Sequence, residues 1–182
     1  TGAFHSFDVS GTETTRSSGQ LNPGSHSEDV LVPELFIEAI MDNGAALGLA
    51  YIPTREMGSK SRTDTNADGD TGTYKASAEL DDVVQLYMDI PLGEAYGSLF
   101  YGKAGIQHAT IKSLESLNSG STYPDKTVFG YTVGLGTKGD LPVSNLYYKA
   151  DFTYTDFQDS NADSGNTVVN NNVSAELEDT AF

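Results

Sequence analysis

The feature that most constrains this chain is a period-two alternation of apolar and polar residues, repeated in segment after segment. Between residues 127 and 137, Phe129, Tyr131, Val133 and Leu135 alternate with small or polar residues. Successive side chains of a β-strand point to opposite faces, so this pattern predicts strands with one apolar face. The same split predicts eight strands, at residues 2–10, 30–41, 45–51, 75–90, 95–111, 127–137, 145–156 and 172–181.

The connections between these strands alternate in length. Residues 42–44, 91–94 and 138–142 form short turns, and Asn43-Gly44 is a strong two-residue hairpin signal. Residues 11–29, 54–73, 112–126 and 157–168 are long and rich in Ser, Thr, Asn, Asp and Gly. An up-and-down antiparallel barrel with all its long loops at one end gives this order.

Composition narrows the classes of function. The 182 residues make up one domain's worth of chain, and we expect a single β-barrel domain over residues 1–182. A net charge of −16 repels phosphate backbones, which excludes nucleic-acid binding but leaves divalent cations and cationic partners open. The chain has no Cys and no apolar run long enough for a transmembrane helix.

Strand number, alternation, loop asymmetry and glycines on the polar face together resemble the eight-stranded outer-membrane barrels of the OmpA and OmpX type. The resemblance implies an all-β transmembrane barrel in a bacterial outer membrane, with a polar interior, short periplasmic turns and extracellular loops. It implies contact with outer-membrane lipid and lipopolysaccharide, and a structural role in which acidic loops can be bound by a phage or an adhesion partner. The lipid-facing set is then Phe129, Tyr131, Val133, Leu135, Tyr148, Phe152 and Tyr154.

The last strand departs from the pattern of that family. Such barrels usually finish on an aromatic residue whose even-spaced upstream partners are apolar, and this chain ends at Phe182. Glu176, Glu178 and Thr180 share its face, while the apolar residues occupy odd positions. We expect that several residues at the C-terminal end of the last strand are missing.

Alternation alone does not say which face of the strands points outward. A soluble secreted or virion-attached β-sandwich, acting as a binding or decoration protein, would bury the apolar face, whereas a membrane barrel shows it to lipid. The polar face mixes Gly, Thr, Gln, Lys and Glu. That mixture favours the membrane barrel, since eight strands leave an interior just wide enough for side chains to fill.

Charged residues recur on the predicted inner face. An unpaired charge in a narrow interior is costly, so we expect these groups to pair and to close the lumen. Counting back from a turn at residues 91–94 makes Asp81 and Lys103 diagonal neighbours. If the barrel is soluble, the same residues are solvated surface charges. The predicted set is Glu34, Glu38, Glu79, Asp81, Lys103, Lys149, Asp151 and Glu176.

One loop has the spacing of a calcium site. Asp64, Asn66, Asp68 and Asp70 match the first half of an EF-hand loop, and residues 159–163 repeat the spacing. Lys75 stands where the loop needs a bidentate Glu, so the alternative interpretation is ordinary Asp, Asn and Gly turn chemistry. We therefore expect no cofactor beyond Ca²⁺ bound weakly at these loops.

No residue pattern predicts an enzyme. His108 lies on the apolar face near the outer end of its strand, where outer-membrane lipid A deacylases of eight strands keep a His–Ser pair. Ser113 and Glu115 are near it in sequence. An interfacial histidine among headgroups is the favoured interpretation of this position, and we predict that His108 is not catalytic.

Overall fold

The computed structural model describes residues 2–15, 19–65, 71–116, 123–142, 146–164 and 172–182. These residues form β-strands joined by turns, and none of the described segments is a helix able to cross a membrane. The predicted all-β class is confirmed. The strands are β1 (Gly2–Thr15), β2 (Gln20–Pro33), β3 (Leu35–Ile40), β4 (Ala46–Ile52), β5 (Arg55–Thr65), β6 (Thr71–Ala95), β7 (Ser98–Ser116), β8 (Lys126–Asp140), β9 (Tyr147–Phe157), β10 (Ser160–Asp163) and β11 (Asn172–Ala181).

Three pairs of these segments are successive pieces of one interrupted strand. Glu34 separates β2 from β3, residues 53–54 separate β4 from β5, and residues 158–159 separate β9 from β10. Pro33 and Pro53 stand at two of the breaks. Proline has no N–H to donate to the ladder, so the strand pairing is interrupted there. The eleven segments therefore form the eight up-and-down strands that the alternation predicts.

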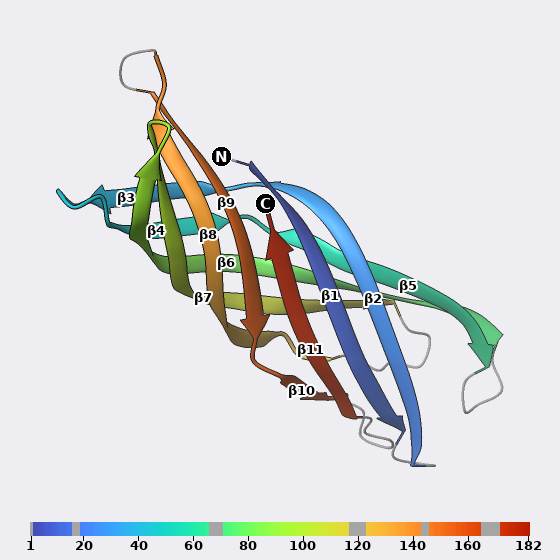
Figure 1. Cartoon of the computed structure of the whole chain (residues 1–182). Helices are drawn as coiled ribbons and strands as arrows, with labels where there is room; N and C mark the ends of the chain where they lie inside the picture. The colour runs from blue at the N-terminus through green and yellow to red at the C-terminus, as the bar shows by residue number, and fades with distance from the viewer. Residues whose placement is uncertain (1, 16–18, 66–70, 117–122, 143–145, 165–171) are drawn as a thin grey trace.

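Every pairing is antiparallel, and hydrogen-bonded neighbours follow the order β2-β1-β11-β9-β8-β7-β6-β4-β3. The first strand pairs with the last, with Asp8 opposite Glu178. The two ends of this order, β2 and β3, are successive pieces of one strand joined through Glu34. Since β2 pairs with β1 and β3 pairs with β4, the sheet curls round into a barrel. Among the described residues no ladder joins β2 to β5, and Figure 1 shows these two strands diverging.

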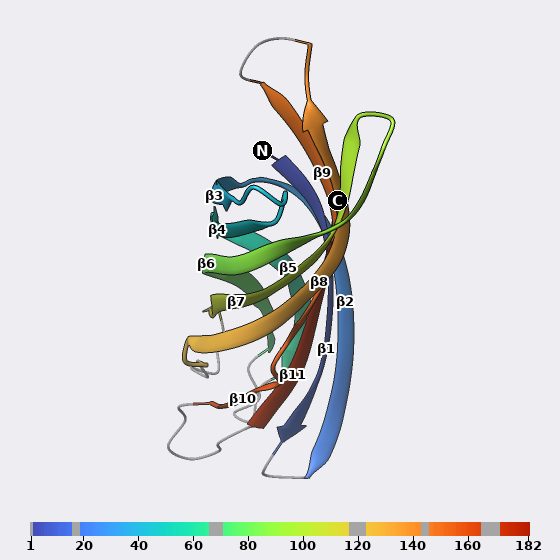
Figure 2. The same cartoon turned by 60° about the vertical axis from the view of Figure 1, so that its left-hand side comes forward.

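The two ends of the barrel differ. Both termini and the hairpins β3–β4, β6–β7 and β8–β9 lie at one end, called here the turn end (Figures 1 and 2). The paired tips of β1 with β2 and of β5 with β6 lie at the opposite end, called the loop end. The three short connections therefore lie together at the turn end, as the predicted alternation of short and long connections requires.

Two of the predicted turns differ in outcome. The turn at Asn43-Gly44 is confirmed: the Gly44 N–H donates to the Met41 carbonyl at 2.9 Å, and Gly44 has φ +82°. The turn at residues 91–94 is wrong. Strand β6 passes a register shift near Pro91 and turns at Tyr96-Gly97, where both residues have positive φ.

Two of the four predicted long loops, 11–29 and 54–73, are mostly strand in the part that the structure describes. Strands β1 and β2 stay paired as far as Thr15 opposite Gln20, inside the predicted loop 11–29. Strands β5 and β6 stay paired as far as Thr65 opposite Thr71. Their polar composition suits strands that face water on the outer side, and composition alone does not separate such strands from loops.

Candidate functional site

The outer surface of the turn-end half carries a band of exposed apolar side chains. On strands β3 to β9 these residues keep 37% to 71% of their surface exposed, although they are large and apolar. A patch this size on a water-facing surface is unusual and marks contact with another apolar phase or partner. The members of this apolar belt are Leu35, Ile37, Leu47, Leu49, Tyr51, Val84, Leu86, Met88, Ile90, Phe100, Ile106, Phe129, Tyr131, Val133, Leu135, Phe152 and Tyr154.

The belt ends where the strands continue toward the loop end. One row of direct cross-strand partners begins as Ile37, Leu49, Leu86, Ile106 and Tyr131, and continues as Asp156, Glu178, Asp8 and Ser27. Strands of a barrel are tilted against its axis, so a row perpendicular to the strands climbs along the barrel. The point along this row where apolar residues give way to acidic ones therefore marks the height at which the belt ends.

The interior of the turn-end half is a connected group of charges, called here the lumen cluster. The Lys149 ammonium donates to Asp89 at 2.6 Å and to Glu38, and the Lys103 ammonium donates to Asp151 at 2.6 Å. Asp89 is fully buried and Lys103 nearly so. Because each cation is shared with at least one carboxylate, these charges are compensated inside the barrel.

Two tyrosines complete the lumen cluster. The Tyr87 hydroxyl donates to Glu38 at 2.7 Å, and the Tyr101 hydroxyl donates to Asp151. A Cβ at Gly48 would lie 2.2 Å from the Tyr87 ring, and one at Gly136 would lie 2.4 Å from the Tyr101 ring. Glycine on the inner face therefore makes room for each ring beside its carboxylate.

A second polar group lies between the lumen cluster and the loop end. His5 contacts Asp179 at 2.9 Å and Glu34 at 3.3 Å, and the Arg55 guanidinium lies 3.7 Å from Asp179. A cavity of about 590 Å³ runs from Phe182 at the turn end to His5. Mixed charges line this cavity, so it suits water or a small polar solute better than an apolar one.

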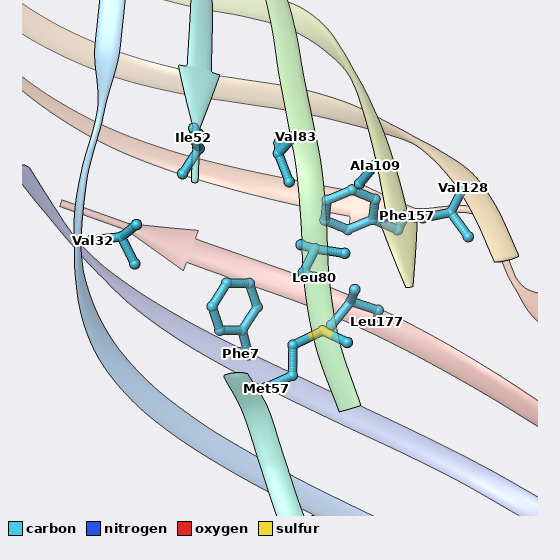
Figure 3. Packing of buried hydrophobic residues seen from close by; sticks show 10 residues of the cluster. All are labelled: Phe7, Val32, Ile52, Met57, Leu80, Val83, Ala109, Val128, Phe157 and Leu177. Carbon is cyan, nitrogen blue, oxygen red and sulfur yellow. The ribbon is translucent and has the colours of Figure 1, made fainter. Parts of the chain in front are cut away.

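The interior of the loop-end half is apolar. Every one of the eight strands contributes a buried side chain, and in Figure 3 these side chains point toward one another from opposite walls. We call this group the apolar plug, because it fills the barrel beyond the cavity. It consists of Phe7, Val32, Ile52, Met57, Leu80, Val83, Ala109, Val128, Phe157 and Leu177.

Several of the predicted lumen charges lie where the inner face was expected. Glu34, Glu38, Lys103, Lys149 and Asp151 all make the interior contacts described above. Of the predicted lipid-facing residues, all but Tyr148 are well exposed members of the belt. Tyr148 is half-buried, and its hydroxyl bonds to Ser98 beside the β8–β9 hairpin.

Three predicted lumen charges lie elsewhere. Glu176 is exposed on the outer face of β11, and Glu79 alternates with inward-facing Ala78 and Leu80. Asp81 is not a neighbour of Lys103. The true turn at residues 96–97 shifts the register, so that Asp89 is the direct partner of Lys103.

Asp81 instead pairs with Lys112 and the Thr54 hydroxyl on the loop-end side of the belt. The Lys112 ammonium, with help from Thr54, holds the pKa of the Asp81 carboxyl below its usual range. The same hydrogen bond raises the pKa of Lys112. The adjacent Asp82 has φ +51° at a register shift in β6, and this bulge explains why residues on its two sides face differently.

The sequence-based set omitted several charged interior residues: Asp89, His5, Arg55, Lys138 and Asp179. Asp89 lies on the polar face by alternation, and its pairing became apparent only from the true register. His5 lies in the weakest predicted strand, and Arg55 follows a strand break at the start of the predicted loop 54–73. No local signal marks Arg55 as buried, since its partner Asp179 is far away in the chain.

The predicted calcium loops are not seen as loops. Asp64 belongs to β5, opposite Gly72, and Asn66, Asp68 and Asp70 lie outside the described residues. The second segment is strand β10, which pairs with β11. Within the described ranges, no three His, Asp or Glu side chains stand close enough to hold a metal ion.

His108 has an aromatic neighbour and lies at the loop-end edge of the belt. Its ring meets the Phe129 ring edge to face, with centroids 5.3 Å apart. Ser113 lies five residues further along the same strand, about 17 Å away at the usual rise per residue. The two side chains therefore do not form a His–Ser pair.

Comparison with known proteins gives structural matches only. No family model and no curated protein matches this chain. Two solved structures of Ail, the attachment invasion locus protein of Yersinia pestis, match this chain over the whole of its own length.

The first, in complex with the heparin analogue sucrose octasulfate, is 10% identical, with a TM-score of 0.42 and 97% of that chain covered. The second is 12% identical, with a TM-score of 0.36 and the same coverage. At these values the likeness carries no argument about function, which rests on the surfaces described above.

Proposed function

We propose that this chain is a structural β-barrel of a bacterial outer membrane that presents polar, acidic strands and loops to the outside. The apolar belt is the observation that carries the proposal. It covers the turn-end part of the neighbouring strands β3, β4, β6, β7, β8 and β9, and its residues alternate with inward-facing polar ones. An apolar outer band with a polar interior is the pattern of a lipid-embedded barrel.

A soluble sandwich does not fit the same surface. A sandwich needs two sheets that bury their apolar faces against each other, whereas here one sheet curls round a polar interior. Water on the belt would expose Leu135, Ile37 and their neighbours with nothing to cover them. Lipid removes that cost.

We further propose that the lumen does not conduct. The apolar plug fills the loop-end half, and the Lys149 and Lys103 pairs occupy the turn-end half beside the cavity. The cavity is lined by His5 and Ile52, and Ile52 also belongs to the plug. In a planar bilayer the protein is expected to give no ion conductance, and steady single-channel steps would contradict the proposed closure.

The outside surface favours a cationic or divalent-bridged partner. The interior holds four basic residues, Arg55, Lys103, Lys138 and Lys149. It also holds five carboxylates, those of Glu34, Glu38, Asp89, Asp151 and Asp179, so nearly all of the net charge of −16 lies on the exterior. Such a surface repels polyanions such as sulfated sugars. Lipopolysaccharide phosphates would then be met through divalent ions, and a phage or adhesion partner through basic groups.

Detergent partition and gel mobility test the membrane assignment. Folded protein is expected to require detergent and to migrate as a compact species until boiled. The variant Val133→Arg places a charge within the belt and is expected to cost about 2–4 kcal/mol if that position faces lipid. The matched control Ser25→Arg, on the exposed outer face of β2, is expected to insert and fold normally. Equal behaviour of the two variants would contradict the proposal.

A further inference from the structure

His5 lies in the interior with a carboxylate on each side of its ring. Its Nδ1 lies 2.9 Å from the Asp179 carboxylate, and its Nε2 lies 3.3 Å from the Glu34 carboxylate. Both His5 and Asp179 are only 2% exposed. The three residues come from the first strand, the last strand and the junction of β2 with β3, which are the parts of the chain that close the barrel.

The protonation state of the ring follows from this geometry. A neutral imidazole has one N–H donor and one lone pair, whereas an ionised carboxylate only accepts hydrogen bonds. The Nδ1 atom is hydrogen-bonded to Asp179, whereas Nε2 is buried beside Glu34 in an ion-pair contact without a hydrogen bond. Only the imidazolium presents an N–H, and a positive charge, to both carboxylates. A neutral ring would turn a lone pair toward one of the carboxylates, without a hydrogen bond and inside a poorly solvated interior.

The other charged groups near His5 modify this balance without reversing it. Arg55 lies 3.7 Å from Asp179 and 4.9 Å from the Phe7 ring centroid, so it shares that carboxylate and opposes a second cation. Glu34 contacts His5 from the other side. Lys103 and Lys149 line the same cavity but have Asp151 and Asp89 as their own partners.

We propose that His5 is a proton-dependent clamp, whose protonated ring ties β1 to β11 and to the β2–β3 junction and whose hold weakens as the pH rises. The proposal does not depend on the membrane assignment, because the contacts lie inside the barrel. It adds a conformational device to a molecule whose other interior pairs are lysines with carboxylates.

The sign of the effect follows from proton linkage. A histidine in an unfolded chain titrates at about pH 6.5. Below that pH the ring is protonated in both states, and the clamp contributes fully. As the pH rises above about 6.5, the unfolded chain releases its proton while the clamped ring keeps it, so unfolding becomes easier. Once the clamped ring also deprotonates, the contribution is lost.

The ring state can be read directly by nitrogen-15 NMR of the folded, labelled protein in detergent micelles. The expected result is an imidazolium signature for His5 at pH 7.5, with both ring nitrogens protonated. His26, whose side chain is half exposed beside Glu28, serves as the internal comparison in the same spectrum. A neutral His5 ring at pH 6 would overturn the proposal.

Variants test whether the clamp stabilises the barrel. Wild-type protein is expected to lose its compact gel mobility at a temperature about 2–4 °C lower at pH 8.5 than at pH 6. The net charge of −16 adds a general loss of stability at high pH, which the control His26→Gln retains. His5→Gln is expected to reduce the pH difference below that of the control.

Glu34→Gln covers the case in which His5→Gln does not fold. Glu34 is 22% exposed, and its replacement leaves Asp179 with both His5 and Arg55. This variant is expected to lose part of the pH difference. A pH difference as large as that of His26→Gln, in whichever of the two variants folds, would contradict the clamp.

Discussion

The two halves of the barrel are built in opposite ways. In the turn-end half the outer surface is apolar and the interior holds charged pairs around a cavity. In the loop-end half the outer surface is polar and acidic, and the interior is the apolar plug. The two apolar layers overlap only where one half meets the other, as at Val83 inside and Val84 outside, or Val128 inside and Phe129 outside. The difference supports the proposed placement, in which lipid surrounds one end of the sheet and water the other.

Strand β6 shows where one arrangement changes into the other. On the turn-end side of Asp82, Val84, Leu86 and Met88 point outward into the belt. On the loop-end side, Leu80 points inward into the plug. The bulge at Asp82 changes which alternate residues face inward, so one bulge moves the apolar face from the outside to the inside.

The turn-end half is expected to be the more sensitive to loss of one residue. Lys149→Met removes the cation shared by Glu38 and Asp89 and leaves two buried carboxylates without it. Breaking a buried pair in this way costs about 3–5 kcal/mol. Urea unfolding of the refolded protein in detergent, followed by gel mobility, measures the loss. A change below about 1 kcal/mol would show that the lumen cluster is well solvated.

The apolar plug is tested by Leu80→Ala. Leu80 is fully buried, so its truncation is expected to cost about 2–5 kcal/mol through lost burial and the cavity left behind. The same urea titration gives the value, and Leu114→Ala serves as the control because Leu114 is 48% exposed on β7. Equal effects of the two variants would mean that the loop-end interior is not a packed core.

Substitution of an inner-face glycine that makes room for an interior tyrosine is expected to give a third, smaller loss of stability. Gly48→Ala adds a methyl group that would meet the Tyr87 ring, so the ring must shift away from Glu38. Overpacking of this kind costs about 1–3 kcal/mol. Gly102→Ala is the matched control, because a Cβ there meets nothing within 4 Å. Stability equal to that of the control would indicate that Tyr87 has room to move.

The smallest effect is expected at the outer pair of Asp81 and Lys112. Lys112 keeps 38% of its side-chain exposure, and Asp81, although only 9% exposed, still accepts the hydrogen bond from Thr54 in the variant. Lys112→Met is therefore expected to lower the unfolding temperature at pH 7 much less than Lys149→Met. The pKa of Asp81 is lowered in the folded state, so its contribution is present above the ordinary carboxyl pKa. It is lost as the pH falls through the lowered value. An effect at pH 7 as large as that of Lys149→Met would remove the contrast between interior and surface pairs.

Alternation in the sequence was sufficient for strand number, order and antiparallel pairing. It also placed Phe129, Val133 and Leu135 on the outer face, because these strands cross the belt without a bulge. It misplaced Leu177 and Glu176, since period two is the same whether the apolar face points out or in. Which orientation applies depends on whether lipid or water surrounds that height, and no short segment encodes the height.

Errors in the predicted strand register account for the other interior contacts that the sequence did not predict. Pro91 resembles a turn residue but is accommodated at a bulge, so the charge pairing counted from it selected Asp81 in place of Asp89. The His5, Asp179 and Arg55 contacts join residues far apart in the chain. Such contacts depend on barrel closure, which sets the register of the first strand against the last and which local spacing does not define.

The central claim is that lipid surrounds the turn-end half and water surrounds the loop-end half. Because the chain has no Cys, single spin labels can be placed at Val133→Cys in the belt and at Ser25→Cys on β2 in protein reconstituted into vesicles. Electron paramagnetic resonance then compares relaxation by oxygen, which concentrates in lipid, with relaxation by a water-soluble nickel complex. The account predicts that oxygen dominates at residue 133 and nickel at residue 25. Nickel dominating at both positions would contradict it.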